Sequence, residues 1–186
     1  MLDWFRARTR NRRKATEIYG AVVAAARSPA YYSDLRVPDT PEGRFEMVAL
    51  VLFLVLERLK CAEPSGQALA QSVIEAFVTD MDDCLREMGV GDLGVPKKVK
   101  RTAAAFYERG GAYRAALASG READLAACLR RFVYRDEHDG AEHGLAEIVS
   151  AQAKSIALAA DRSIYEGNTL VALFKLAGGG TGRFGG

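Results

Sequence analysis

Apolar residues make up 49% of this 186-residue chain and charged residues 27%, which is the composition of a globular domain. The formal net charge is only +2, too small to indicate nucleic-acid binding by itself. The longest apolar run, residues 47–56, covers about half of a bilayer core, and no secretory signal follows the N-terminal arginines. We therefore expect one cytoplasmic domain of ordinary size without a transmembrane segment.

The charge is unevenly distributed along the chain. Residues 1–14, MLDWFRARTRNRRK, contain six basic residues and one acidic residue, whereas the remainder contains 20 basic and 23 acidic residues. We interpret residues 1–14 as a basic N-terminal arm that is either solvated or in contact with ribosomal RNA or anionic lipid. Leu2, Trp4 and Phe5 precede the arginines and make an anionic membrane surface one of the candidate partners.

Apolar residues recur at helical spacing along most of the chain, and no strand alternation is found. The sequence therefore predicts an all-α, single-domain bundle of about six to seven helices with no sheet. The expected helices cover approximately residues 12–27, 41–60, 65–88, 96–118, 122–135, 142–165 and 168–177. We assign residues 15–177 to the helical domain and residues 178–186, GGGTGRFGG, to a flexible tail.

The helix that begins near residue 41 has the clearest start signal. Thr40 or Asp39 is expected to cap it. Gly43 costs about 1 kcal/mol relative to alanine in a helix, so we expect another group to approach the backbone closely there. Arg44 is a cation at a helix start, where the dipole disfavours it, and is expected to pair with Asp39 or with the acids near residue 80. Residues 47–56 then predict a central helix buried on nearly every face.

Other positions carry local expectations. Ser65 is expected to cap the helix that follows, and Gly89 to end it. The Gly110–Gly111 pair predicts a kink or a tight helix crossing. The three cysteines, Cys61, Cys84 and Cys128, show no CxxC spacing and are expected to be reduced, in buried or half-buried helical positions.

The segment DMDDCLREMGVGDLGVPKKVKR, residues 80–101, places acids at a helix end and bases at the next helix start, opposite to what helix dipoles favour. In an antiparallel hairpin each cluster would offset the other, with exposed pairs worth about 0–1 kcal/mol each. The segment can also present a charged surface to a partner, and both interpretations can hold. The predicted partner-binding residues are Asp80, Asp82, Asp83, Arg86, Glu87, Asp92, Lys97, Lys98, Lys100 and Arg101, together with Asp39 and Arg44.

Motifs for catalysis are scarce. An aspartate-rich helix can hold magnesium against a diphosphate in all-α isoprenoid enzymes, but here Arg86 stands where the DDxxD pattern needs aspartate. A magnesium-dependent enzyme that uses Asp80, Asp82 and Asp83 is therefore the least favoured function. His138 lies in a polar segment that we interpret as a solvated loop. The sequence has no GxSxG, P-loop or EF-hand pattern, so we predict a non-catalytic protein without cofactor or metal.

The segment DMDDCLREMGVGDLGVPKKVK closely resembles the signature of the ubiquinol–cytochrome c chaperone family, which are assembly factors of the cytochrome bc1 complex. Further segments resemble the family in the same order: ARSPAYY (26–32), VPDTPEGRFEM (37–47), RLK (58–60) and FYERGGAYRAAL (106–117). The resemblance covers about residues 19–135. Glu108 departs from the family pattern, in which a glycine is expected before Arg109, and the C-terminal third matches weakly.

The resemblance implies a function. Mitochondrial members of the family bind newly made cytochrome b near the ribosomal exit, with a small partner protein, and pass it on for haem insertion. It implies that this chain is a chaperone for cytochrome b or another bc1 subunit, at the cytoplasmic face of the inner membrane or on the matrix side of a mitochondrion. It does not imply the same small partner. A ribosome- or RNA-associated binding module remains the alternative.

Overall fold

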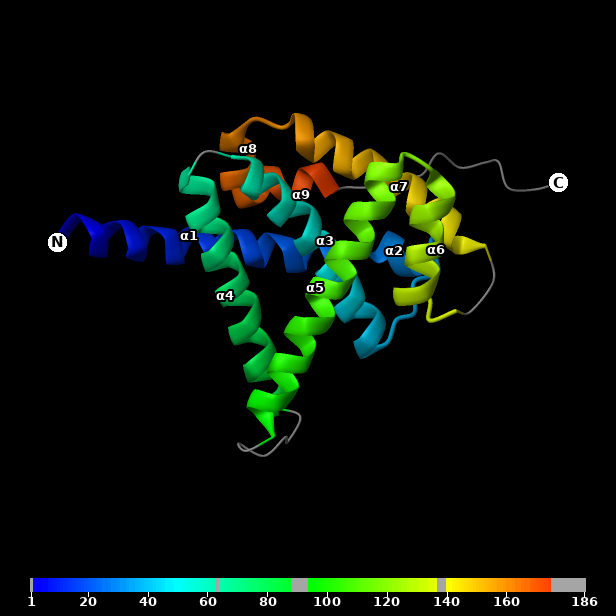
Figure 1. The fold of residues 1–186 in the computed structure, drawn as a ribbon, viewed down its shortest axis with the longest axis horizontal. Coiled ribbons are helices and arrows are strands. Elements are labelled where there is room, and N and C mark those ends of the chain that lie inside the picture. The colour runs from blue at the N-terminus through cyan, green and yellow to red at the C-terminus, as the bar shows by residue number, and fades with distance from the viewer. Residues whose placement is uncertain (1, 63, 88–93, 137–139, 175–186) are drawn as a thin grey trace.

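The computed structural model describes residues 2–62, 64–87, 94–136 and 140–174, and every regular element in these ranges is a helix. The helices are α1 (Leu2–Ala26), α2 (Pro29–Ser33), α3 (Pro41–Cys61), α4 (Pro64–Glu87), α5 (Val95–Ser119), α6 (Glu122–Phe132), α7 (Ala141–Leu158), α8 (Asp161–Tyr165) and α9 (Gly167–Phe174). The expected all-α single domain is confirmed (Figure 1). No described helix is long and apolar enough to cross a membrane.

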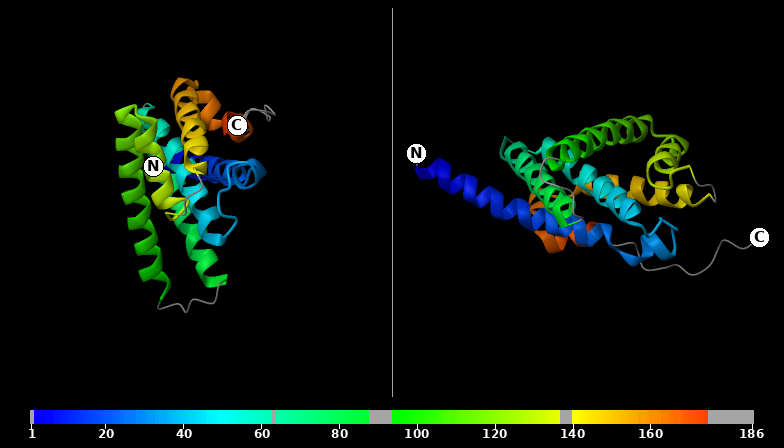
Figure 2. Two further views of the ribbon diagram at one scale, coloured as in Figure 1. Left: turned by 90° about the vertical axis from the view of Figure 1, so that its right-hand side faces the viewer. Right: turned by 90° about the horizontal axis from the view of Figure 1, so that it is seen from below.

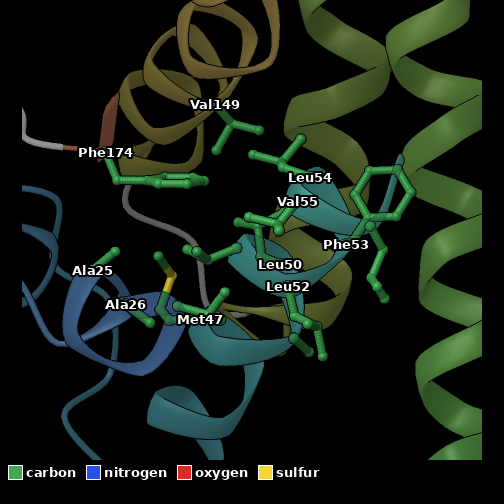
Figure 3. Close-up of a cluster of buried hydrophobic side chains, with 14 of the residues drawn as sticks. Ala25, Ala26, Met47, Leu50, Leu52, Phe53, Leu54, Val55, Val149 and Phe174 are labelled. Atoms are coloured by element: carbon green, nitrogen blue, oxygen red, sulfur yellow. The ribbon is translucent and has the colours of Figure 1, made fainter. Parts of the chain in front are cut away.

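The central element is α3, and the other long helices pack around it. Between residues 47 and 56 every side chain except Val48 is at most 4% exposed, which confirms the predicted central helix. Ten apolar residues in succession leave this helix without a polar face, so it can only be stable inside the bundle. In Figure 3, Leu50 and Leu54 of α3 lie among side chains from α1, α7 and α9, including Val149 and Phe174.

The first helix is longer than predicted: α1 begins at Leu2 rather than near Arg12. Its N-terminal part extends beyond the other helices (Figures 1 and 2), so the basic arm continues the same helix. Alanine, arginine and lysine favour helix, and no glycine or proline precedes Gly20 to interrupt it. The exposed side chains in this part of α1 include Arg10, Arg12 and Arg13. Residues 178–186, the predicted tail, lie outside the described residues.

One predicted helix is divided in the structure. The helix expected over residues 142–165 is α7 followed by α8, because the chain leaves the helical conformation at Ala159, which is extended with ψ 139°. The carbonyl oxygen of Ala159 accepts a hydrogen bond from Nη2 of Arg58 on α3, at 2.8 Å. This contact is tertiary, and no glycine or proline marks the break in the sequence. At α6 the helix ends at Phe132 rather than 135, and Arg135 and Asp136 have positive φ angles of 54° and 63°.

The start of α3 follows the sequence prediction. The Thr40 hydroxyl accepts a hydrogen bond from the Gly43 backbone N–H at 3.1 Å, so Thr40 is the cap. A Cβ atom on Gly43 would lie 2.0 Å from the carbonyl oxygen of Pro38, which confirms the close approach expected there. Arg44 donates from Nε to Oδ1 of Asp39 at 2.6 Å, and the pairing of Arg44 with an acid is also confirmed.

The remaining local predictions have mixed outcomes. Helix α4 begins at Pro64, so Ser65 lies inside the helix and is not its cap, and Gly89 lies outside the described residues. Gly110 is buried against the Phe53 ring, but an added Cβ would lie 3.4 Å from that ring, an ordinary contact distance, and Gly111 has nothing within 4 Å, so the tight crossing predicted for this pair is not confirmed.

The cysteines are free, but their predicted burial is correct for only one of them. Cys128 is half-buried, whereas Cys61 and Cys84 are exposed. Both exposed cysteines lie near the C-terminal ends of their helices, where fewer neighbouring elements cover the helix surface.

Candidate functional site

Helix α4, which ends at Glu87, and helix α5, which begins at Val95, form the two arms of a V in Figure 1. The described surface beside this pair contains a groove of about 990 Å³. We call it the α4–α5 groove; its lining comes from α1, α3, α4, α5 and α6 and from the two residues 135 and 136. It therefore includes part of the segment that the sequence predicts as a partner surface.

The floor of the α4–α5 groove is apolar. It consists of Val23 from α1, Phe45 and Val48 from α3, and Met81 and Leu85 from α4. All five side chains are half-buried, and all except Leu85 pack against the hydrophobic core. The Phe45 ring, for example, stacks on a buried ring of α4 at a centroid distance of 6.3 Å. The opposite side of these residues remains available to a bound molecule.

The sides of the groove carry opposite charges. On the α4 side it is lined by Asp80 and Glu87, and on the α5 and α6 side by Arg101, Arg131 and Arg135. Among the described residues, no ion pair within 4.0 Å joins an acid of α4 to a base of α5. The hypothesis that the two clusters neutralise each other by direct pairing is therefore not supported among the described residues.

The acids of α4 have other partners. The Tyr19 hydroxyl of α1 donates to Oδ2 of Asp80 at 2.7 Å, and burial followed by this hydrogen bond raises the pKa of Tyr19. Asp82 accepts from Nε of Arg86 on the same helix at 2.7 Å. Two of the three aspartates considered as magnesium ligands thus have other contacts: Asp80 binds Tyr19 of α1, and Asp82 forms a local ion pair. No group of three or more histidine, cysteine or acidic residues among the described residues could hold a metal ion.

Most of the other predicted site residues that the structure describes do not line the groove. Asp83, Lys97, Lys98 and Lys100 are exposed and do not line it, and Asp92 lies outside the described residues. Arg44 lines the groove while paired with Asp39, and the hydrogen bond from Arg44 lowers the pKa of Asp39.

Sequence reasoning missed the strongest polar contact of the groove, the ion pair between Glu46 and Arg109. The guanidinium donates from Nε and Nη2 to the two carboxylate oxygens at 2.6 and 2.7 Å, and from Nη1 to the carbonyl oxygen of Ala105 at 3.0 Å. Glu46 is 6% exposed, and the guanidinium also lies 5.2 Å from the centre of the Phe132 ring. This pair joins α3 to α5 across 63 positions of the sequence and fixes the bottom of the groove.

A second, smaller cavity of about 560 Å³ lies between α3, α5 and α7. Its polar edge includes Glu57, which accepts hydrogen bonds from Nε and Nη2 of Arg114 at 2.7 and 2.8 Å and from Lys60 at 2.9 Å. The hydrogen bond from Arg114, opposed by partial burial and assisted by Lys60, lowers the pKa of Glu57 from 4.5 to about 2.

This shift predicts a pH dependence of stability. Because the folded-state pKa of Glu57 is depressed, its contribution is present above pH 4.5 and is lost as the pH falls toward about 2. Solvent screening of the half-exposed Arg114 reduces the contribution to about 1 kcal/mol or less. Urea unfolding of the wild type and Glu57→Gln should differ by this amount at pH 7, and the difference should shrink at pH 3. A difference that does not change with pH would contradict the assignment.

An all-helical domain with an open, apolar-floored groove between charged sides is the kind of protein that can hold a segment of another polypeptide. The family model described as ubiquinol-cytochrome C chaperone matches residues 33–172, and the chain belongs to this family. The chain is also similar to a solved structure described as the crystal structure of the Cbp3 homolog from Brucella abortus. The identity is 38%, the TM-score is 0.78, and the match covers 90% of this chain and 93% of that one. No curated protein matches the chain significantly.

Proposed function

We propose that this protein is a non-catalytic assembly chaperone of the cytochrome bc1 complex and that it holds newly made cytochrome b, or another bc1 subunit, in the α4–α5 groove. The family match over residues 33–172 supports the assembly role. The groove with its apolar floor is the observation that carries the proposal. Most of its lining, from α3 to α6, falls within the matched residues.

The chemistry of the groove suits a client that will enter a membrane. Such a subunit exposes apolar surface before insertion, and apolar surface in water favours aggregation. A floor that includes Phe45, Val48 and Leu85 can cover part of that surface, while the charged sides keep the complex hydrated. Binding and release are sufficient for this role, so it requires no reacting group in the groove.

The exposed ends of α4 and α5 extend the proposed partner surface beyond the groove. Asp83, Lys97, Lys98 and Lys100 project into solvent next to it. In this proposal they contact polar parts of the client. Asp92 of the connecting segment belongs to the same proposed surface.

The basic N-terminal part of α1 supports a second contact. Arg10, Arg12 and Arg13 are exposed in the N-terminal half of α1, and the N-terminal part of this helix extends beyond the other helices (Figure 2). We propose that it places the chaperone near the ribosomal exit or at the cytoplasmic face of the inner membrane. Co-sedimentation with ribosomes or with anionic vesicles that weakens steeply with salt would support one of these surfaces.

The test of the chaperone proposal is a pair of variants in cells that lack the wild-type gene. Met81→Ser combined with Leu85→Ser makes the groove floor polar. Leu158→Ser removes an apolar side chain that is 88% exposed and does not line the groove. We expect the floor variant to lower the cytochrome b content of membranes several-fold, and Leu158→Ser to leave it unchanged.

Circular dichroism of the purified variants checks that both proteins are folded. A folded floor variant that supports a normal cytochrome b content, measured from reduced-minus-oxidised spectra, would overturn the proposal. Equal losses in both variants would also contradict it, because the effect would then not depend on the groove.

A further inference from the structure

We infer, on the basis of the proposed function, that the α4–α5 groove takes a helical client segment of about two turns. One face of this segment is apolar, its basic residues lie toward α4, and its acidic residues lie toward α5 and α6. Three independent features of the groove lead to this description: the backbone of its walls, its size and floor, and the separation of its charges.

The walls of the groove favour a helix over an extended peptide. They are formed mainly by helices, whose backbone N–H and C=O groups are already paired within each helix. The described residues contain no strand whose edge could pair with an extended segment. A bound strand would therefore leave its backbone groups without partners on this surface, whereas a helix satisfies its own.

The volume of the groove is comparable with that of a short helix. A helix is about 10–12 Å wide and rises about 1.5 Å per residue, so two turns occupy roughly 800–1,200 Å³. The groove volume of about 990 Å³ matches this range.

The floor can receive one face of such a helix. Phe45 and Val48 are three positions apart on α3, and Met81 and Leu85 are four apart on α4, so each pair lies on one helix face. The unbranched side chain of Met81 can adapt to different apolar faces.

The charged residues of the groove determine where a bound segment should carry its basic and its acidic residues. Glu87 on the α4 side and Arg101 on the α5 side are exposed, and neither has an ion pair with a described residue. Arg131 pairs with Glu108 at 3.2 Å, but both side chains are more than 60% exposed, and such a pair is easily exchanged. The buried Glu46–Arg109 pair is already neutral as a unit.

Other charges in the lining reduce this contrast: Glu42 and the Asp39-paired Arg44 at the start of α3, and Arg27 and Asp136 at the two sides. Arg27, directly after α1, lines the groove. Burial and the neighbouring acids raise the pKa of the Cys84 thiol, and Arg27 lies close enough to lower it slightly. Asp136 lines the groove next to Arg135. The α4 side then has two acids, Asp80 and Glu87, and one base. The α5 and α6 side has three arginines and one acid. A client segment with separated charges is complementary to both sides.

The experiment measures binding of fluorescent 14-residue helical peptides to the purified full chain by anisotropy. Four peptides share one apolar face: one has lysines along one flank of this face and glutamates along the other flank, one has only lysines, one has only glutamates, and one has the separated charges with a central proline. We expect the peptide with separated charges to bind at least about tenfold tighter than the other three. This preference should weaken at high salt.

Two matched variants test which charged residues of the groove determine the peptide preference. Glu87→Lys makes the α4 side basic and should shift the preference toward the glutamate peptide. Arg101→Glu makes the α5 side acidic and should shift it toward the lysine peptide. Both side chains are exposed and outside the described ion pairs, so folding should not change. Opposite shifts in the two variants support the inference, and equal affinities for all charge patterns in the wild type and both variants would overturn it.

The outcomes separate this inference from the chaperone proposal. If the proline peptide binds as tightly as the peptide with separated charges, the helical occupant is wrong even though the groove binds peptides. If no peptide shows a charge preference while the floor variant still loses cytochrome b in cells, only the inference fails. If the floor variant keeps a normal cytochrome b content, the proposed function fails whatever the peptides show.

Discussion

Removal of either partner of the Glu46–Arg109 pair should lower the free energy of unfolding by about 3–5 kcal/mol, because it leaves the other charge buried without compensation. Glu46 is 6% exposed, and the Arg109 side chain is 19% exposed. Urea unfolding of Glu46→Ala and Arg109→Ala, followed by circular dichroism, measures the two losses. The double variant Glu46→Leu, Arg109→Met should lose less than either single variant, since it removes both charges and keeps the volume of the side chains.

The matched control is Arg114→Ala, which breaks a pair of the same bidentate geometry between α3 and α5. The Arg114 side chain is 53% exposed and that of Glu57 is 30% exposed. Its loss should cost about 1 kcal/mol or less because solvent screens the charges. Equal losses for Arg109→Ala and Arg114→Ala would show that burial does not determine the strength of these pairs.

Gly43→Ala should destabilise the protein by roughly 3 kcal/mol, the upper end of the usual cost of forcing an extra group into a packed interior. The added Cβ would lie 2.0 Å from the backbone oxygen of Pro38, and a backbone atom cannot move aside as a flexible side chain can. The displacement would also disturb the hydrogen bond from the Gly43 N–H to Thr40. Thermal and urea unfolding measure the loss.

Gly111→Ala is the matched control in the interior of α5. Nothing lies within 4 Å of the Cβ that the substitution would add there. This variant should be more stable than the wild type by about 0.5–1 kcal/mol, because alanine loses less backbone entropy than glycine in a helix. A Gly43→Ala protein as stable as the wild type would mean that the loop at Pro38 relaxes freely.

The contacts that the sequence could predict are local or follow from composition. The run 47–56 has no polar face, so its burial is independent of what surrounds it. Asp39 and Arg44 are five positions apart at one helix start, and the Thr40 cap spans three. In these cases the helix geometry alone brings the groups together.

The contacts that could not be predicted join distant segments. Glu46 meets Arg109 and Tyr19 meets Asp80 only because α3, α5, α1 and α4 pack in this arrangement. The only sequence signal for the buried ion pair was an acid directly before the apolar run. The break at Ala159 depends in the same way on Arg58 of α3.

The charged segment 80–101 was predicted as a site, but its geometry was not. An antiparallel hairpin was expected to bring acids and bases together, whereas α4 and α5 diverge and place Glu87 and Arg101 on different sides of a groove. The crossing angle of two helices depends on the side chains that pack between them and on the other helices of the bundle. The acids at the end of α4 and the bases at the start of α5, both unfavourable for the helix dipoles, therefore do not form direct pairs with each other among the described residues.

The most direct test of the groove as the client site is photo-crosslinking in cells. A photoreactive amino acid at position 85 lies in the groove floor, and the same residue at position 158 is on an exposed part of α7 outside the groove. We predict that position 85 crosslinks to cytochrome b or another bc1 subunit and that position 158 does not. The absence of a bc1 subunit among the products from position 85, or equal crosslinking from position 158, would contradict the account.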